Sequence, residues 1–432
     1  MEYKIINKPT YNLHMIKTNK FKTIVFKVIF RKEITQREIS LRNLLIDNLI
    51  FSNKYAKTRK EMVKRKQDLY GTEIFGSNTR AGNHLLTELT LSILNPKYTE
   101  NTMLDESLKF FCDTLFAPNI EDGGFAKENF EITKEDNLTI IKGEKENSSR
   151  TAITNLKKLV AKNASEDSPI ALDMNGRKED IEKITREDLY KYYQDEFFKS
   201  IIDIYVIGDF DFYEMSKKIE EYFKFHYLIK EKKPLRLSYP KTRSKPKEVI
   251  EESSFIQSRL AMALYFSSLT EKERKYVSTL LTIILGGSPE SKLFLNVREK
   301  NSYAYSISAN YYKTDDFFLI TAGISYKNYK NVLKEIKNEL NNLKSGKISD
   351  YELTNAKELV ISVLNDIFES PASIIDYYFN MELLDHDDLK TQIAIFKDIT
   401  KDEIITLASK LQIDIIYLLK EKENRDAKIT DQ

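Results

Sequence analysis

The chain repeats one order of elements in its two halves, and this repetition is the feature that most constrains its fold. Near the end of each half, Ile-Thr precedes a basic and then an acidic residue, at Ile184–Leu189 and at Ile399–Ile404. Thr followed by acidic residues is typical of a helix N-cap and first turn. Apolar runs that favour a closing strand follow, at Ile202–Val206 and at Ile413–Tyr417. Repeated order of this kind predicts duplicated domains.

The two halves also begin alike. Strand-like runs rich in β-branched and aromatic residues occur at Thr23–Arg31 and at Leu260–Ser267. Each run precedes a helical pattern with a wide apolar surface, at about Gln36–Phe51 and about Glu271–Leu285. Apolar surfaces of that width are expected of helices that pack against a sheet.

Two further strand-like runs, Leu86–Leu94 and Phe317–Ile324, precede long charged helical segments. Strands mixed with long helices, without regular βαβ alternation or a glycine-rich phosphate loop, indicate α+β domains. We therefore predict two homologous α+β domains, each a mainly antiparallel sheet with helices packed on one face. Two unrelated α+β domains that share common cap chemistry are the alternative.

A polar stretch rich in Lys, Arg and Pro, residues 228–247, has the least regular composition of the chain. It predicts a linker between an N-terminal domain at 1–227 and a C-terminal domain at 248–432.

Charge and hydropathy exclude two classes of partner. Lys and Arg number 68 and Asp and Glu number 66, so we expect no nucleic-acid partner. No stretch approaches the roughly 18 apolar residues of a membrane span. The first residues, Met1–Lys8, lack the apolar core of a secretory signal, so we expect a cytoplasmic protein without a membrane partner. The single cysteine, Cys112, is predicted to be a small buried apolar side chain.

The most informative stretch is Leu285–Ser306, which reads LGGSPESKLFLNVREKNSYAYS. Its Gly pair is expected to end the preceding helix, and an apolar face then predicts a short second helix that ends at Arg298. Tyr303 and Tyr305 follow with the alternation of a strand.

This stretch resembles the C-terminal half of insulinase-like (pitrilysin) metallopeptidases, with their Gly-Gly turn, Ser-x-Leu-Phe, Arg-Glu-Lys and a Tyr before a strand. The resemblance extends over nearly the whole chain through the duplicated layout, and it is sharp over Leu285–Ser306 and Thr321–Ile324. In that family an Arg and a later Tyr hold the substrate backbone near the metal, which implies substrate binding by Arg298 and Tyr305. Tyr303 departs from the usual Leu. Without the resemblance, Arg298 reads as a surface ion-pair residue.

The zinc motif of active family members is degenerate in this chain. Those members carry His-x-x-Glu-His on the first long helix, where two His share one face and the Glu activates a water. The corresponding positions here are Leu44, Asp47 and Asn48, and leucine and a neutral amide are poor zinc ligands. The third ligand, a Glu expected near Leu138–Ile141, is also missing. We therefore expect no metal and no catalytic residue in this chain, with Asp47 a relic of the base or a helix-flanking acid.

The resemblance implies a non-catalytic subunit of a heterodimeric zinc peptidase, an arrangement known among bacterial members. A zinc-bearing insulinase-like homologue would supply the metal, and this chain would supply Arg298 and Tyr305 to bind a peptide or small-protein substrate. One alternative is a catalytically inert scaffold or peptide-binding protein. Another is a stand-alone hydrolase, which would need a Ser-His-Asp or Cys-His constellation that four scattered histidines do not indicate.

Overall fold

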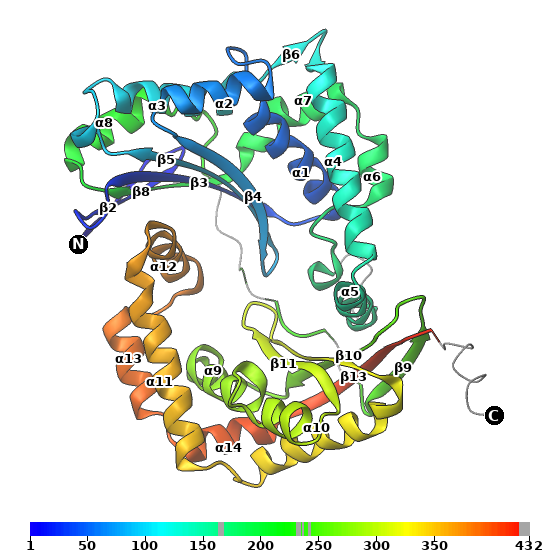
Figure 1. Cartoon of the computed structure of the whole chain (residues 1–432). Coiled ribbons are helices and arrows are strands. Elements are labelled where there is room, and N and C mark those ends of the chain that lie inside the picture. Colours follow the sequence, from blue (N-terminus) through cyan, green and yellow to red (C-terminus); the bar gives the residue numbers. More distant parts are fainter. Residues whose placement is uncertain (163–167, 230–234, 236, 241–242, 423–432) are drawn as a thin grey trace. The chain divides into compact units, whose positions relative to one another are not determined.

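A computed structural model of the chain describes residues 1–162, 168–229, 235, 237–240 and 243–422 (Figure 1). The described residues form two compact units, each with its own sheet. Unit 1 contains residues 1–142, 172–235 and 367–380, and unit 2 contains the described residues of 143–171, 236–366 and 381–432. Of the predicted linker, residues 230–234, 236 and 241–242 lie outside the described residues.

The described part of unit 1 contains a six-stranded sheet in the order β1-β2-β8-β3-β5-β4. All neighbours are antiparallel except β2 and β8, which are parallel. The central strand β3 aligns Phe26 with Leu91 of β5 and with Val206 of β8. The strands are β1 (Glu2–Asn7), β2 (Asn12–Lys17), β3 (Thr23–Glu33), β4 (Glu73–Ala81), β5 (His84–Leu94) and β8 (Ile201–Gly208).

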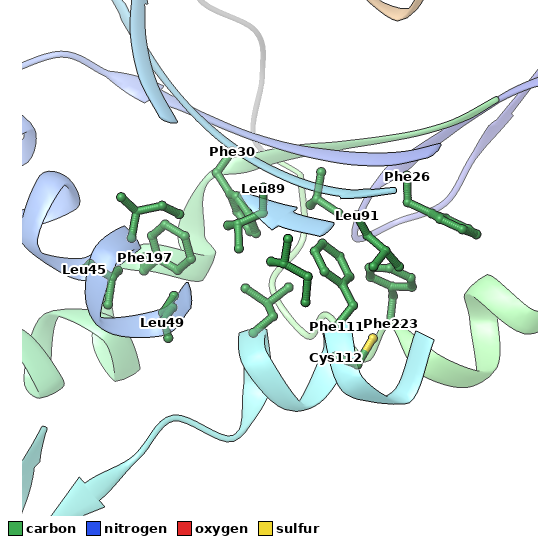
Figure 2. Close-up of a cluster of buried hydrophobic side chains, with 14 of the residues drawn as sticks. Phe26, Phe30, Leu45, Leu49, Leu89, Leu91, Phe111, Cys112, Phe197 and Phe223 are labelled. Carbon is green, nitrogen blue, oxygen red and sulfur yellow. The ribbon is translucent and has the colours of Figure 1, made fainter. Parts of the chain in front are cut away.

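Helices cover one face of this sheet and close the larger apolar core. Phe26, Leu89 and Leu91 of the sheet are buried with Phe111 of α3 and Phe223, which follows α8 (Figure 2). Cys112 is buried at the edge of the same cluster, as predicted. The elements are α1 (Gln36–Phe51), α2 (Arg59–Asp68), η1 (Pro96–Tyr98), α3 (Met103–Phe116), the hairpin β6 (Ile120–Glu121) and β7 (Gly124–Phe125), α4 (Lys127–Lys145), α6 (Lys178–Lys183), α7 (Arg186–Asp195), η3 (Phe197–Lys199) and α8 (Phe212–Tyr222).

The described part of unit 2 contains a five-stranded sheet in the order β11-β12-β10-β13-β9. Only the pair β13 and β9 is parallel among these described strands. Strand β11 lies at one edge of the sheet. The strands are β9 (Lys247–Glu252), β10 (Ser258–Phe266), β11 (Ala304–Tyr312), β12 (Phe317–Ile324) and β13 (Leu411–Lys420).

The helix predicted at about Glu271–Leu285 is continuous but contains two stretches of wider, π-type turns. These are η4 (Glu273–Val277) and η5 (Ile283–Gly287), on either side of α9 (Ser278–Thr282). The remaining elements of this part of the chain are η6 (Phe294–Lys300), η7 (Tyr326–Asn328), α10 (Tyr329–Lys344), α11 (Asp350–Asp366), η8 (Ile367–Glu369), α12 (Pro371–Leu384), α13 (Leu389–Asp398) and α14 (Lys401–Lys410).

The repeated end of each half is confirmed. Thr185 and Thr400 each accept a hydrogen bond from the backbone N–H three residues on, and the carboxylates of Asp188 and Glu403 accept one from the cap residue's own N–H. Such capping boxes fix the start of α7 and α14. Strands β8 and β13 follow them. The predicted fold class, two α+β sheets of mainly antiparallel strands, is also confirmed.

One segment of each half packs in the unit formed by the other half. Helix α5 (Ser148–Ala161), followed by η2 (Pro169–Ala171), buries Leu156 against Leu319 and Ile415 of the second sheet. In unit 1, Asp376 of α12 accepts a hydrogen bond from Lys27 of β3 at 2.8 Å. The second face of each sheet therefore also carries a helix, beyond the one-face packing that we expected. The domain boundaries 1–227 and 248–432 concern homology and stay a prediction.

No helix in the described ranges has the length and apolar character needed to cross a membrane.

Candidate functional site: a closed zinc-motif position and an open Arg–Tyr motif

Helix α1 carries the three zinc-motif positions, Leu44, Asp47 and Asn48. Its start is fixed by Thr35, whose hydroxyl accepts a hydrogen bond from the Glu38 N–H. Leu44 is fully buried in the core of unit 1 and offers only carbon atoms. The position of the first family ligand is therefore part of the hydrophobic core.

Asn48 is also fully buried, and its side chain is satisfied by neighbouring helix residues. Its Nδ2 donates to Thr133 Oγ1 of α4 at 2.7 Å and to the Leu44 carbonyl at 2.8 Å. Its Oδ1 accepts a hydrogen bond from Asn129 Nδ2 at 3.3 Å. A buried amide with both ends paired is a stable packing element, and as a neutral group it is a poor ligand for zinc.

Asp47 belongs to the same polar contact between α1 and α4. Its Oδ2 accepts a hydrogen bond from Asn137 Nδ2 at 2.8 Å. Burial raises the pKa of Asp47 to about 6, although the hydrogen bond from Asn137 opposes this shift. Burial therefore disfavours the charged form of Asp47, because the carboxylate loses hydration.

The α4 residues that face the zinc-motif positions are Asn129, Thr133 and Asn137, one turn apart along a single helix face. Our sequence reasoning looked for the third ligand at Leu138–Ile141 and did not identify this stripe. The four-residue spacing of three short polar side chains was the available signal.

This set of side chains does not fit zinc. One position is leucine, one is an amide already paired at both ends, and the α4 face supplies amides and a hydroxyl instead of a carboxylate. Within the described ranges, no group of three or more His, Cys, Asp or Glu side chains is placed to hold a metal ion. We derive no catalytic step from this cluster.

The Arg–Tyr motif, Arg298 and Tyr305, lies in unit 2 at the end of η6. Leu293 and Val297 are fully buried and anchor this short helix, and Asn296 Nδ2 donates to Glu339 Oε1 of α10 at 2.9 Å. Arg298 is on the opposite, exposed face. Its side chain is 43% exposed, its guanidinium lies over the Phe294 ring at 4.6 Å, and its Nε is 3.6 Å from Glu299 Oε1. The Phe294 ring thus covers one side of the guanidinium, while much of the side chain stays exposed.

The chain reverses directly after Arg298. The Ser302 N–H donates to the Arg298 carbonyl at 3.0 Å, the Tyr303 N–H donates to the Val297 carbonyl at 2.9 Å, and Ser302 has φ +50°. This reversal starts β11 beside the end of η6. The sequence placed Arg298 and Tyr305 together, and the backbone brings them to one end of the edge strand, without a hydrogen bond between the two side chains.

Tyr305 is 67% exposed and lies at a β-bulge, where the register with β12 shifts between Ala304 and Ser306. We expected Tyr303 and Tyr305 to alternate along one strand and point the same way. This expectation is wrong, because β11 begins only at Ala304 and Tyr303 lies before it. Bulges redirect a side chain relative to the strand and are frequent near functional sites. The large exposed aromatic ring has no role in the core.

The Gly pair before the motif acts through close packing. A Cβ on Gly286 would lie 2.8 Å from Ala309 Cβ and 2.9 Å from Ala309 N of β11. Neither of these two described glycines has a positive φ. Gly286 therefore allows the helix end to approach the edge strand, which fixes the position of the Arg–Tyr motif.

Two repeated α+β sheets, with an Arg–Tyr motif after a close-packed Gly pair, agree with the resemblance to insulinase-like metallopeptidases. Comparisons with known proteins agree. The family model described as the peptidase M16 inactive domain matches residues 183–360. The probable inactive metalloprotease YmfF of Bacillus subtilis (strain 168) is 26% identical over 363 residues, covering 82% of this chain and 83% of that protein. The chain is therefore similar, in sequence and in fold, to insulinase-like, or M16, peptidases.

Solved structures support the same assignment. A conserved protein from Enterococcus faecalis V583 matches with a TM-score of 0.89 at 26% identity, covering 98% of this chain and 99% of that chain. A peptidase M16 inactive domain from Pseudomonas fluorescens matches with a TM-score of 0.75 at 15% identity, covering 98% and 99%. The second likeness, at that identity, concerns the fold alone.

Proposed function

We propose that the chain is the substrate-binding, non-catalytic subunit of a two-chain peptidase, and that Arg298 and Tyr305 contact the substrate. The observation that carries this proposal is the exposure of both side chains at the edge strand of unit 2. In the same chain, the zinc-motif positions are occupied by a leucine and by paired polar groups.

The surroundings of the Arg–Tyr motif suit an extended peptide. No described strand pairs with the outer edge of β11, which leaves backbone N–H and C=O groups available there. An extended chain can add to such an edge, where main-chain hydrogen bonds give affinity. The guanidinium of Arg298 and the hydroxyl of Tyr305 would then donate to peptide carbonyls.

Arg298 can change partners at little cost. Its one ion pair with a described residue, the adjacent Glu299, is exposed and 3.6 Å long, and pairs of that kind contribute about 0–1 kcal/mol. A substrate carbonyl or carboxylate can therefore replace it. An arginine kept for stability would instead be held by several short contacts.

The partner in this proposal is a zinc-bearing insulinase-like homologue in the cytoplasm. It would carry the zinc and the residues that activate water, while this chain binds and orients the peptide or small protein. The inactive-domain family match and the name of the Bacillus relative support the absence of independent catalysis.

Activity of the reconstituted pair tests the proposal. Peptide hydrolysis is measured with the chain co-expressed with a zinc-bearing homologue, and Arg298→Ala is expected to lower the rate about 10²–10³-fold without dissociating the pair. Lys334→Ala, which removes an exposed charge from α10 of the same unit, is the matched control. Full activity of Arg298→Ala would exclude the proposed role.

A scaffold without substrate contact is the second candidate, favoured by the fully paired cluster at Asn48. It predicts that Arg298→Ala and Lys334→Ala behave alike in every assay. Substitutions in an interface would then be the ones that impair function.

A further inference from the structure

Arg259 lies on β10 in the sheet of unit 2, where β12 separates β10 from the edge strand β11. It pairs across the sheet with Gly323 of β12, which in turn pairs with Ser306 of β11. A Cβ on Gly323 would lie 2.4 Å from Arg259 Nη1 and 2.9 Å from Ser306 Oγ. The guanidinium therefore extends over Gly323 toward Ser306, in the space that a side chain at position 323 would fill.

The charge of Arg259 is not balanced within the described ranges. Its Nε donates to Ser148 Oγ at 3.0 Å, and no carboxylate of a described residue lies within ion-pair distance. Burial lowers the pKa of the Arg259 guanidinium, because no acidic neighbour offsets the desolvation. A partly buried cation of this kind gains free energy when an anion reaches it.

A small cavity adjoins this guanidinium. It has a volume of about 20 Å³ and is lined by Arg259, Gly323, Ser306 and Thr321 of the sheet and by Ser149 of α5. Helix α5 begins at Ser148, so the positive end of its dipole points to the same place. Arginine, hydroxyl groups and a helix N-terminus together favour a bound anion.

We propose that this cavity binds a carboxylate of a peptide that lies along the outer edge of β11. This inference rests on the proposed function, because Ser306 of the cavity directly follows Tyr305 of the Arg–Tyr motif. The volume of about 20 Å³ exceeds the roughly 10–15 Å³ that one water requires, so a carboxylate oxygen can enter it, and a carboxylate matches the fork of a guanidinium. The carboxylate is that of a peptide C-terminus or of an Asp or Glu side chain.

Three synthetic peptides distinguish these sources. An uncharged eight-residue peptide with a neutral fluorophore is prepared with an amidated C-terminus, with a free C-terminus, and amidated with one central Glu. Binding to the purified full chain is followed by fluorescence anisotropy. At least one of the two carboxylate peptides is expected to bind roughly ten- to a hundredfold more tightly than the amide.

Arg259→Gln and Gly323→Ala are both expected to remove this preference. The second variant retains the charge but displaces the guanidinium, and the atoms that have to move are the side-chain ends of Arg259 and Ser306. Lys334→Gln removes one exposed charge from the same unit and is expected to leave the preference intact. Circular dichroism checks that each variant is folded.

The outcomes separate this inference from the proposed function. Arg298→Gln is expected to weaken all three peptides alike; if it has no effect while Arg259→Gln removes the preference, the cavity stands and the role of Arg298 fails. Equal affinity of the wild type for the three peptides, or an unchanged preference in Arg259→Gln, overturns the inference. So does the absence of binding up to about 1 mM peptide.

Discussion

The polar residues at the zinc-motif positions and those of the Arg–Tyr motif differ in where their hydrogen bonds go. In unit 1, Asn48 and Asp47 are held by three residues of α4. In unit 2, the polar contact of Arg298 with a described residue is the long one with Glu299, its guanidinium otherwise lies over the Phe294 ring, and Tyr305 is largely exposed. A buried polar group needs internal partners, whereas an exposed one with few partners is free to meet a ligand. The hydrogen bonds of the first cluster therefore stabilise unit 1, whereas the second cluster is the one for which we propose substrate binding.

The largest effect on stability is expected at the first zinc-motif position. Leu44→Ala should lower the free energy of unfolding by about 2–5 kcal/mol, because it opens a cavity in the core of unit 1. Urea unfolding followed by circular dichroism measures this, since the chain has no Trp. Leu359→Ala, at a 38% exposed leucine of α11, is the matched control and should change little. Equal effects of the two variants would show that Leu44 is not a core residue.

The next effect depends on pH. The pKa of Asp47 is raised to about 6 by burial, so the folded state keeps a proton that the unfolded state loses near pH 4. Stability therefore falls as pH rises from about 4 to about 6, by up to about 3 kcal/mol, and the deficit remains at higher pH. Asp47→Asn, which still accepts from Asn137, should be more stable than the wild type at pH 8 and equal to it at pH 4.

Urea midpoints at the two pH values measure this difference. A constant difference between wild type and Asp47→Asn would mean that the pKa of Asp47 is the same in the folded and unfolded states. Its burial between α1 and α4 would then have no electrostatic cost.

The sequence predicted elements well where the determinants are local. The predicted bounds of α1 and β12 agree with the structure to the residue, because their periodic patterns and caps lie within the segments themselves. It did not predict that α5 and α12 pack on the sheets of the opposite halves, because nothing within an amphipathic helix specifies which sheet it covers. The partners of Asp47 and Asn48 were missed for the same reason.

At the candidate site, the sequence predicted the residues better than their geometry. Arg298 and Tyr305 were identified from a linear pattern, but the bulge at Tyr305 depends on pairing with β12. The Gly pair was expected to end the preceding helix, and η5 does end at Gly287, but the close contact of Gly286 with Ala309 was not predicted. Both features arise from tertiary contacts that a single sequence does not display.

A smaller loss of stability is expected at the second ligand position. Asn48→Ala removes the acceptor of Asn129 and the donor to Thr133, and buried groups left unpaired cost about 1–3 kcal/mol. The same urea experiment measures it, with Asn338→Ala on the exposed face of α10 as the control. If Asn48→Ala is as neutral as that control, the hydrogen bonds between α1 and α4 do not stabilise unit 1.

The smallest effect on stability is expected at the Arg–Tyr motif, and it sharpens the comparison most. Arg298→Ala should change the free energy of unfolding by less than about 0.5 kcal/mol, because the side chain is exposed and its ion pair is long. Arg274 of the same unit is the opposite case, since its guanidinium donates to both oxygens of Asp316 at 2.8 and 3.1 Å. Arg274→Ala should therefore be clearly destabilising. If Arg298→Ala destabilises as much as Arg274→Ala, Arg298 is a structural residue and its exposure is no evidence of substrate binding. If Arg298→Ala is neutral, any loss of peptide binding in this variant results from the lost contact between Arg298 and the peptide.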